Sequence, residues 1–247
     1  MVSDIAEIMA NCRRCVVLTG AGMSAESGVP TFRGKDGLWR KFRAEELATM
    51  EAFLDNSKIV WEWYNWRRDL MSKVQPNSGH HAIRELETLC DNFVLITQNV
   101  DNLHRVAGTQ SILELHGNIH HNKCVDCNKP CESSLSIDPD NIPTCEHCGG
   151  KIRPDVVWFG EMLDPVVINQ AFQESEQADI FFSVGTSAII YPAASLPPLA
   201  KRSGATLVEV NVEETPISFL ADFQVREKSG EFLPRLVAAL KGKTEPG

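Results

Sequence analysis

The sequence predicts an α/β fold built around a parallel sheet, and three observations support this prediction. Apolar runs of strand length occur at residues 16–18, 93–97, 180–184 and 206–210, and each ends in small or polar residues. Segments with helical spacing, such as residues 80–90, lie between these runs. The chain has 247 residues, 43% of them hydrophobic, which is enough for one large α/β domain with or without a small insertion.

The predicted elements follow one another in a regular order. A first helix over residues 5–9 precedes the strand at 16–18. Residues 44–74 are predicted to be helical and carry a cluster of aromatic side chains. The helix at 80–90 has apolar residues three apart and leads into the strand at 93–97. The carboxyl ends of parallel strands meet at one edge, so the strand endings should converge on one crevice. The alternative is that they are ordinary polar turns.

Charge and composition exclude several classes of protein. The net charge is −9 and the pI is near 5.3, which argues against binding to nucleic acids and to anionic membranes. Asp4 and Glu7 interrupt any apolar segment near Met1, so no signal peptide is expected. We therefore expect a cytoplasmic protein whose eight cysteines are thiols or metal ligands rather than disulfides.

The segment that follows the first strand is typical of a dinucleotide-binding turn. Gly20 permits a tight turn, Gly22 lets backbone N–H groups approach a pyrophosphate, and Ala25 suits close helix packing. Residues 34–37 then form a loop, where an ordinary dehydrogenase would continue into a second strand with an acidic ribose ligand. The alternative is a glycine-rich turn that binds no ligand.

Two Cys-x-x-Cys pairs are the strongest local signal in the chain. Residues 128–144 separate the pairs, a spacing typical of a structural zinc ribbon with four thiolates. The predicted zinc ligands are Cys124, Cys127, Cys145 and Cys148. The alternatives are a redox pair or a chance pairing, and the site should have no open coordination position.

Other cysteines and a histidine lie near these motifs. Cys131 and His147 could replace a thiolate only by leaving a better-spaced cysteine unused. Cys12-x-x-Cys15 has the same spacing without a second pair, so Cys12 is predicted to pack before the first strand.

Polar residues with catalytic potential follow the strand at 93–97. Asn99 and Asp101 would point into the predicted crevice, where an amide and a carboxylate could hold a carboxamide or ribose hydroxyls. His116 precedes the cysteine segment and is flanked by Gly117, which favours a cleft position for a general base over a purely structural role. The histidines without that context are expected at the surface or in helix caps: His80, His81, His104, His120 and His121.

Several motifs follow one another along the chain: Gly20-Ala21-Gly22-x-Ser24, Gly28-x-Pro30-x-Phe32-Arg33, Thr97-Gln98-Asn99-x-Asp101-x-Leu103-His104, His116-Gly117, the paired Cys-x-x-Cys, Val157-x-Phe159-Gly160-Glu161, Gly185-Thr186-Ser187 and Asn211. Together they resemble the sirtuins, a family of NAD-dependent protein lysine deacylases. The resemblance covers nearly the whole chain, and no single motif carries it.

The resemblance implies one catalytic domain over residues 1–247. Its large part would be a Rossmann-type parallel sheet domain comprising about 1–36, 76–118 and 153–247. A small domain would consist of a helical insertion over about 37–75 and a zinc ribbon over about 119–152. NAD as co-substrate and acyl-lysine-bearing proteins or peptides would meet between these parts, and one structural zinc ion would be bound.

The family mechanism is implied by the same resemblance. The acyl oxygen attacks the ribose carbon that bears nicotinamide, His116 activates a ribose hydroxyl as general base, and water releases lysine and O-acyl-ADP-ribose. Asn99 and Asp101 would orient the nicotinamide end, while Phe32 would cover the reacting carbon against water.

The resemblance also assigns the binding residues. The NAD site would comprise Gly20, Ala21, Gly22, Ser24, Ala25, Pro30, Thr31, Phe32, Arg33, Trp39, Gln98, Asn99, Val100, Asp101, His116, Gly185, Thr186, Ser187, Asn211, Val212, Glu213 and Ser229. The substrate peptide would pair as an added strand with a segment containing Val157, Phe159, Gly160 and Glu161.

Tyr64 and Arg67 add a prediction about the acyl group. Three residues apart on a helix, they face the same way, and together they offer a phenol and a guanidinium suited to a carboxylate. This resembles the Tyr-x-x-Arg pattern of sirtuins that remove succinyl, malonyl and glutaryl groups. Arg68 also has suitable spacing, and the alternative is an aromatic stripe packed on the core with charges in solvent.

Two other functions remain compatible with these residues. A mono-ADP-ribosyltransferase of the same architecture would use the same NAD pocket, and a nucleotide-sensing module would bind NAD without turnover. His116 argues against the sensor, because a sensor has no use for a base at that position.

Overall fold

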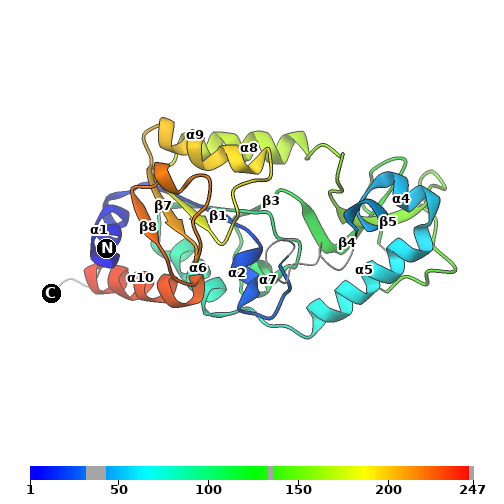
Figure 1. Cartoon of the computed structure of the whole chain (residues 1–247), viewed down its shortest axis with the longest axis horizontal. Helices are drawn as coiled ribbons and strands as arrows, with labels where there is room; N and C mark the ends of the chain where they lie inside the picture. The colour runs from blue at the N-terminus through cyan, green and yellow to red at the C-terminus, as the bar shows by residue number, and fades with distance from the viewer. Residues whose placement is uncertain (32–42, 133–135, 245–247) are drawn as a thin grey trace.

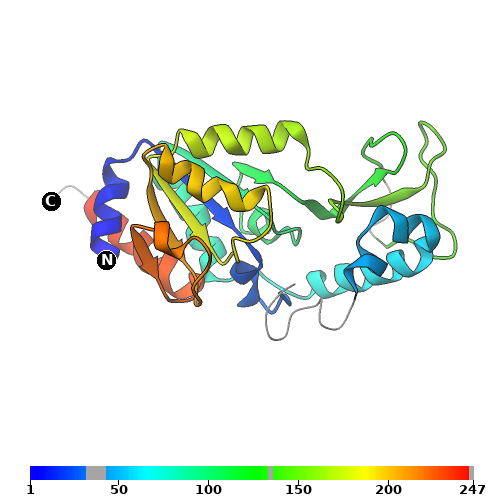
Figure 2. The same ribbon diagram turned by 45° about the horizontal axis from the view of Figure 1, so that its top comes forward.

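The structure is a computed structural model of the 247-residue chain and describes residues 1–31, 43–132 and 136–244 (Figures 1 and 2). Three residues predicted to contact NAD, Phe32, Arg33 and Trp39, lie outside the described residues. The elements in chain order are α1 Val2–Asn11, β1 Arg14–Thr19, α2 Ala21–Ala25, α3 Ala44–Leu47, α4 Met50–Asp55, α5 Ser57–Ser72, α6 Ser78–Leu89, β2 Asn92–Thr97, α7 Leu103–Val106, β3 Ile112–Glu114, β4 Gly117–Cys124, β5 Ile152–Val156, α8 Pro165–Glu176, β6 Ile180–Val184, η2 Ala193–Ser195, α9 Leu196–Arg202, β7 Thr206–Val210, η3 Ser218–Leu220, β8 Phe223–Val225 and α10 Ser229–Thr244.

A six-stranded parallel sheet organises the larger part of the molecule. The strand order is β3-β2-β1-β6-β7-β8, and every neighbouring pair is parallel. The predicted strands correspond to β1, β2, β6 and β7, so the predicted parallel α/β sheet is confirmed. The sequence analysis missed β3 and β8, which have three residues each and are too short to show a periodic signal.

Helices cover both faces of this sheet. Figures 1 and 2 show α8 and α9 along one face and α1, α6 and α10 along the other. Side chains alternate along β1 accordingly: Cys15 and Val17 belong to the core under α1, α6 and α10, while Val16 and Leu18 belong to the core under α8 and α9. Double burial explains why these strands are continuous apolar runs. Cys12 packs against the first of these cores, as predicted.

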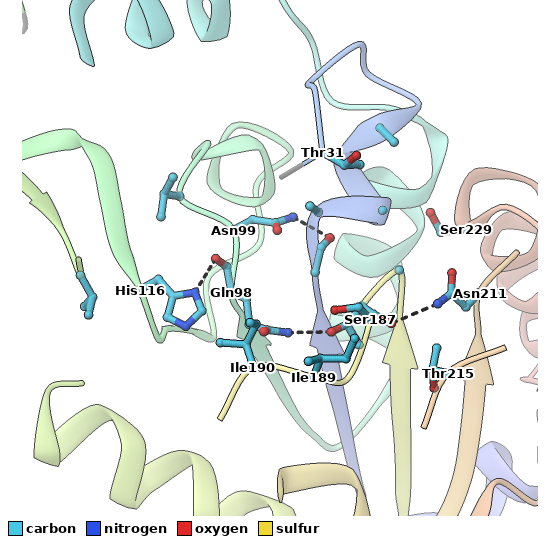
Figure 3. Close-up of a pocket in the computed structure, with 18 of the residues that line it drawn as sticks. Thr31, Gln98, Asn99, His116, Ser187, Ile189, Ile190, Asn211, Thr215 and Ser229 are labelled. Carbon is cyan, nitrogen blue, oxygen red and sulfur yellow. Dashed lines mark hydrogen bonds between the residues drawn. The ribbon is translucent and has the colours of Figure 1, made fainter. Parts of the chain in front are cut away.

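The strand order reverses between β1 and β6, and the turns after these two strands touch. Gly22 donates its backbone N–H to the carbonyl of Gly185 over 2.8 Å. A side chain at Gly185 would place its Cβ 2.4 Å from the Met23 nitrogen, and this residue has a φ of +58°. Only glycine therefore permits this approach. The result is a crevice at the switch point of the sheet (Figure 3).

A smaller unit lies beyond one end of the sheet and consists of α3, α4, α5 and the antiparallel pair β4 and β5 (Figure 1). Its separate apolar core includes Trp61, Ile119 and Trp158. The predicted helical region 44–74 is divided into three helices. The side chains of Thr49 and Asn56 begin α4 and α5 by accepting backbone N–H groups. The domain boundaries given above stay a prediction.

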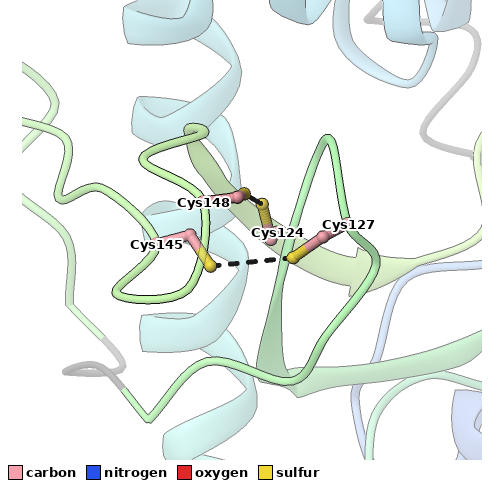
Figure 4. A group of neighbouring side chains, drawn as sticks. All are labelled: Cys124, Cys127, Cys145 and Cys148. Atoms are coloured by element: carbon pink, nitrogen blue, oxygen red, sulfur yellow. Dashed lines mark hydrogen bonds between the residues drawn. The ribbon is translucent and has the colours of Figure 1, made fainter.

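The four predicted zinc ligands lie together (Figure 4). Their sulfur atoms are all within 4.8 Å of one another, with Cys127 and Cys145 3.8 Å apart and Cys124 and Cys148 3.4 Å apart. A tetrahedral zinc ion with Zn–S bonds of about 2.3 Å would hold sulfurs roughly 3.8 Å apart. The thiolate donor set and its spacing thus fit structural zinc.

Within the part of the chain that the structure describes, no helix is long and apolar enough to span a membrane.

Replacing one of the four clustered cysteines is expected to abolish metal binding. Cys145→Ser should remove bound zinc and partly unfold the smaller unit, because this segment has too little core to fold without its metal. Elemental analysis and thermal melting of the purified proteins measure both effects. Cys131→Ser, a change in the same segment but outside the cluster, should keep the metal. A wild-type protein without zinc, or a Cys145→Ser protein with full metal content, would contradict this assignment.

Candidate functional site

A cavity of about 870 Å³ opens at the switch point and extends to the smaller unit. The following residues of the predicted NAD site line it: Gly20, Ala21, Gly22, Ala25, Thr31, Gln98, Asn99, Val100, His116, Gly185, Thr186, Ser187, Asn211, Val212, Glu213 and Ser229. All six predicted substrate-binding residues line it as well: Tyr64, Arg67, Val157, Phe159, Gly160 and Glu161. The two predicted sets thus share one cavity.

Three described residues of the predicted NAD site lie outside this lining: Ser24, Pro30 and Asp101. Ser24 is fully buried behind the wall, and its hydroxyl accepts the Asn99 Nδ2 hydrogen at 3.2 Å. Asp101 is 6% exposed and accepts the backbone N–H of Leu103. Burial raises the pKa of the Asp101 carboxyl, while the bond from Leu103 opposes the rise. Ser24 and Asp101 therefore support the cavity wall from behind.

His116 lies between β3 and β4, where the large sheet passes into the smaller unit (Figure 3). Its Nδ1 is 3.0 Å from the carbonyl oxygen of Gln98. A carbonyl can only accept, so Nδ1 carries the hydrogen and Nε2 keeps its lone pair. Burial lowers the pKa of His116, against the raising effect of the Gln98 bond. The imidazole is therefore neutral near pH 7 and can accept a proton.

The backbone next to His116 requires glycine. Gly117 has a φ of +77°, and a Cβ there would lie 2.2 Å from the carbonyl oxygen of Asp155. Any larger residue would push β4 away from β5 and move His116 with it. The glycine that the sequence analysis took as a sign of a cleft thus has a steric role.

Asn99 is held in place by the turns around it. Its Nδ2 donates to the Gly20 carbonyl at 3.0 Å and to Ser24 Oγ, and its backbone N–H donates to Thr97 Oγ1. Gln98 donates through Nε2 to Thr186 Oγ1 at 3.0 Å. These bonds connect the ends of β1, β2 and β6, so the polar groups of the site are fixed before any ligand arrives.

Two of the histidines that were predicted to lie at the surface or in caps are buried. His80 does cap α6 by accepting the Asn77 backbone N–H, but it is fully buried. His104 is 3% exposed and forms no cap, so that prediction was wrong. Its Nε2 lies 3.1 Å from Thr19 Oγ1, and its ring lies 4.7 Å from that of His80. Burial lowers the pKa of both, to about 4 for His80, so both are neutral structural groups.

Tyr64 and Arg67 lie on α5 with buried side chains that reach the cavity. Trp158 donates its indole N–H to the Tyr64 hydroxyl at 2.8 Å, so the hydroxyl hydrogen of Tyr64 points elsewhere. The guanidinium of Arg67 stacks 4.8 Å from the Trp63 ring. Burial lowers the pKa of Arg67 and raises that of Tyr64. The pair forms a desolvated donor group at one end of the cavity.

Arg68, the other arginine with suitable spacing, is used elsewhere. Its Nε donates to the Ile119 carbonyl and its Nη2 to Asn122 Oδ1, both at 2.7 Å. The guanidinium also stacks over the Trp61 ring at 5.2 Å. Burial lowers the pKa of Arg68 to about 10. These contacts bind α5 to β4, and Arg68 is absent from the cavity lining among the described residues.

The segment 157–161 lines the cavity. Its backbone donates from Val157 to the His116 carbonyl and from Phe159 to the Ala48 carbonyl, both at 2.9 Å. Glu161 binds Arg153 and the Trp158 N–H. Burial favours a higher pKa for Glu161, but these bonds hold the pKa below its ordinary value. Glu161 thus shapes this segment through its carboxylate.

Several lining residues were missed by the sequence analysis, among them Trp63, Trp158, Ile189, Ile190, Thr215 and Pro216. Most of them are apolar and belong to no motif. Their one available signal was position: 189–190 follow β6 and 215–216 follow β7, at the carboxyl edge where the crevice was expected.

Comparisons with known proteins agree with this geometry. The family model described as the Sir2 family matches residues 20–192. An NAD-dependent protein deacylase of Aquifex aeolicus is 52% identical over 92% of this chain and 95% of its own length. One of Pyrococcus abyssi is 50% identical over 96% and 97%. A solved Sir2 homolog–NAD complex has a TM-score of 0.91 and 45% identity, covering 98% of this chain and 94% of its own. The chain belongs to the Sir2 family.

Proposed function

We propose that this protein is an NAD-dependent protein lysine deacylase that removes acetyl and succinyl groups, with malonyl and glutaryl as related substrates. One observation carries the proposal: the neutral His116 shares a cavity with a dinucleotide-type crevice on one side and the buried Tyr64 and Arg67 pair on the other. The names of the similar proteins and the NAD and ADP-ribose complexes of similar structures support it.

The residues have separate roles in this reaction. NAD supplies the ribose carbon at which nicotinamide is exchanged for the acyl oxygen. The Nε2 atom of His116 takes the proton from a ribose hydroxyl, because Nδ1 already donates its hydrogen to the Gln98 carbonyl. Asn99 orients the nicotinamide end from a fixed position, with Asp101 behind it. The segment 157–161 aligns the peptide that carries the acyl-lysine.

Nicotinamide release measured with and without an acyl-lysine peptide tests the function. A deacylase releases nicotinamide only when the acyl peptide is present, and mass spectrometry finds free lysine and O-acyl-ADP-ribose. Release without an acyl group, together with a labelled protein, would indicate a mono-ADP-ribosyltransferase. No release under any condition would indicate a binding module.

Replacing His116 is expected to remove the general base. His116→Ala should lower kcat by about two to four orders of magnitude while NAD binding stays largely intact. Steady-state kinetics and a titration with NAD measure the two effects. His121→Ala, a change at an exposed histidine, should leave both unchanged. Near-normal turnover in folded His116→Ala would remove this residue from the mechanism.

The pH dependence should follow from the same histidine. The base works when neutral, and burial lowers the pKa of His116 below its ordinary value of 6.5. Activity should therefore persist below pH 6.5 and fall as the pH drops through the lowered pKa. Measuring kcat/KM between about pH 5 and 8 tests this. An acid limb centred above about pH 7 would mean that another group titrates.

Removing the Arg67 cation should separate the two acyl activities. Arg67→Met is expected to weaken desuccinylation by about ten- to a hundredfold, chiefly through KM, because the acyl carboxylate loses a charged partner. Deacetylation should survive, since an acetyl group does not extend to the pair. Tyr64→Phe should act in the same direction more mildly, and Lys73→Met at the exposed end of α5 is the control. Equal losses on both substrates would make the pair a scaffold.

A further inference from the structure

A buried carboxylate lies beneath one wall of the cavity without belonging to its lining. Glu209, on β7, is 1% exposed. It accepts hydrogen bonds from Thr215 Oγ1, from Ser218 Oγ at 2.6 Å and from Arg226 Nη1 at 2.6 Å. Arg226 also donates to Ser218 Oγ at 3.0 Å. The carboxylate is thus paired with a cation and with two hydroxyl groups, as a buried charge requires.

The Glu209 carboxylate and its partners hold the segment that follows β7. This segment, residues 211–216, is called the pocket loop below. All six residues of the pocket loop line the cavity. Its first residue, Asn211, is fixed because its Nδ2 donates to the Thr186 carbonyl at 3.0 Å. Its other end is fixed by Thr215, whose hydroxyl binds Glu209 and whose backbone N–H donates to Ser218 Oγ at 2.8 Å.

Between these two ends the pocket loop has little burial of its own. Val212, Glu213 and Glu214 are exposed. A loop segment with few buried contacts takes its position from its anchors. Replacing Glu209 with glutamine would leave Arg226 without its carboxylate. The two hydroxyls that donate to the carboxylate would then face an amide, whose NH2 group is itself a donor. The anchor at Thr215 would then weaken.

The pocket loop is remote from the reacting end of the cavity. Asn99 follows β2 and the pocket loop follows β7, three strand spacings away in the order β2-β1-β6-β7, or roughly 14 Å. Figure 3 shows His116 and Asn99 on one side of the cavity and Asn211 and Thr215 on the other. A dinucleotide whose nicotinamide end lies near His116 would extend its adenosine end to the pocket loop.

We propose that Glu209 is a positioning residue that fixes the pocket loop and thereby determines the affinity for the adenosine half of NAD. The proposal takes the identity of the ligand from the proposed function. Glu209 acts through Thr215 and Ser218 and does not touch the ligand. Its effect should therefore appear in nucleotide affinity and leave the chemical step unaltered.

Glu209→Gln tests the proposal in the full-length protein. The KM for NAD should rise about tenfold with kcat changed less than about twofold, because the interaction lost serves binding in ground and transition states alike. Calorimetric titration should show a similar weakening for ADP and ADP-ribose. Inhibition by free nicotinamide should stay the same, since nicotinamide does not reach the pocket loop. Ser218→Ala removes one hydroxyl of the same group and should weaken ADP binding in the same direction.

Asp222→Asn is the matched control. Asp222 is also a carboxylate that binds a cation, Lys201, and a group of β7, the Leu207 N–H, but it has no bond to the pocket loop. This variant should lower the melting temperature and leave ADP affinity unchanged.

Three outcomes would overturn the proposal: unchanged ADP affinity in folded Glu209→Gln, equal weakening in Asp222→Asn, or a loss of kcat in proportion to lost stability. Should Glu209→Gln fail to fold, unchanged ADP affinity in Ser218→Ala overturns it. The ADP titrations are independent of turnover. A failure of the proposed function, seen as no nicotinamide release by the wild-type protein, is therefore distinguishable from a failure of this inference.

Discussion

The contact between the turns after β1 and β6 is the constraint on which the site depends. The backbones of Gly22 and Gly185 approach until a hydrogen bond joins them, and no side chain fits between them. This approach connects two strands at the point where the sheet reverses its order. Asn99 then binds the carbonyl of Gly20, so the polar turn after β2 takes its position from the same turn. A displaced turn would therefore disturb both the nucleotide crevice and the reacting end.

The smaller unit is held together by buried polar groups as well as by apolar packing. Arg68 donates to the Ile119 and His121 carbonyls and to Asn122 Oδ1 of β4, and Arg153 of β5 stacks 3.4 Å from the Trp158 ring. Each cation stabilises an orientation, because a buried guanidinium tolerates few alternative partners. Two adjacent arginines of α5 thus differ in role: Arg68 holds the helix to β4, and Arg67 reaches the cavity.

Much of this arrangement was predictable because it depends on local patterns. Buried parallel strands are apolar runs, and the glycines and paired cysteines are specified by backbone and metal geometry. The rest depends on distant contacts. His104 is buried against Thr19 and His80, which come from other elements. The pocket loop is fixed by Glu209 on β7, which pairs with Arg226 just after β8. Periodicity carries no information on such pairings, nor on β3 and β8, which exist because neighbouring strands offer them an edge.

Under the proposed function, the electrostatics around Arg67 explain how one channel would serve both neutral and charged acyl groups. Arg67 is desolvated, and its pKa falls for that reason, while the negative charge of Asp101 and the Tyr64 hydroxyl partly compensate. The cation is thus tolerable without a ligand, which a neutral acetyl group requires. A substrate carboxylate that reaches Tyr64 and Arg67 would supply the remaining negative charge that the buried guanidinium lacks. Its own desolvation would be offset by the same contact. Selectivity would then come from the balance of two desolvation costs, with no need to exclude the smaller group.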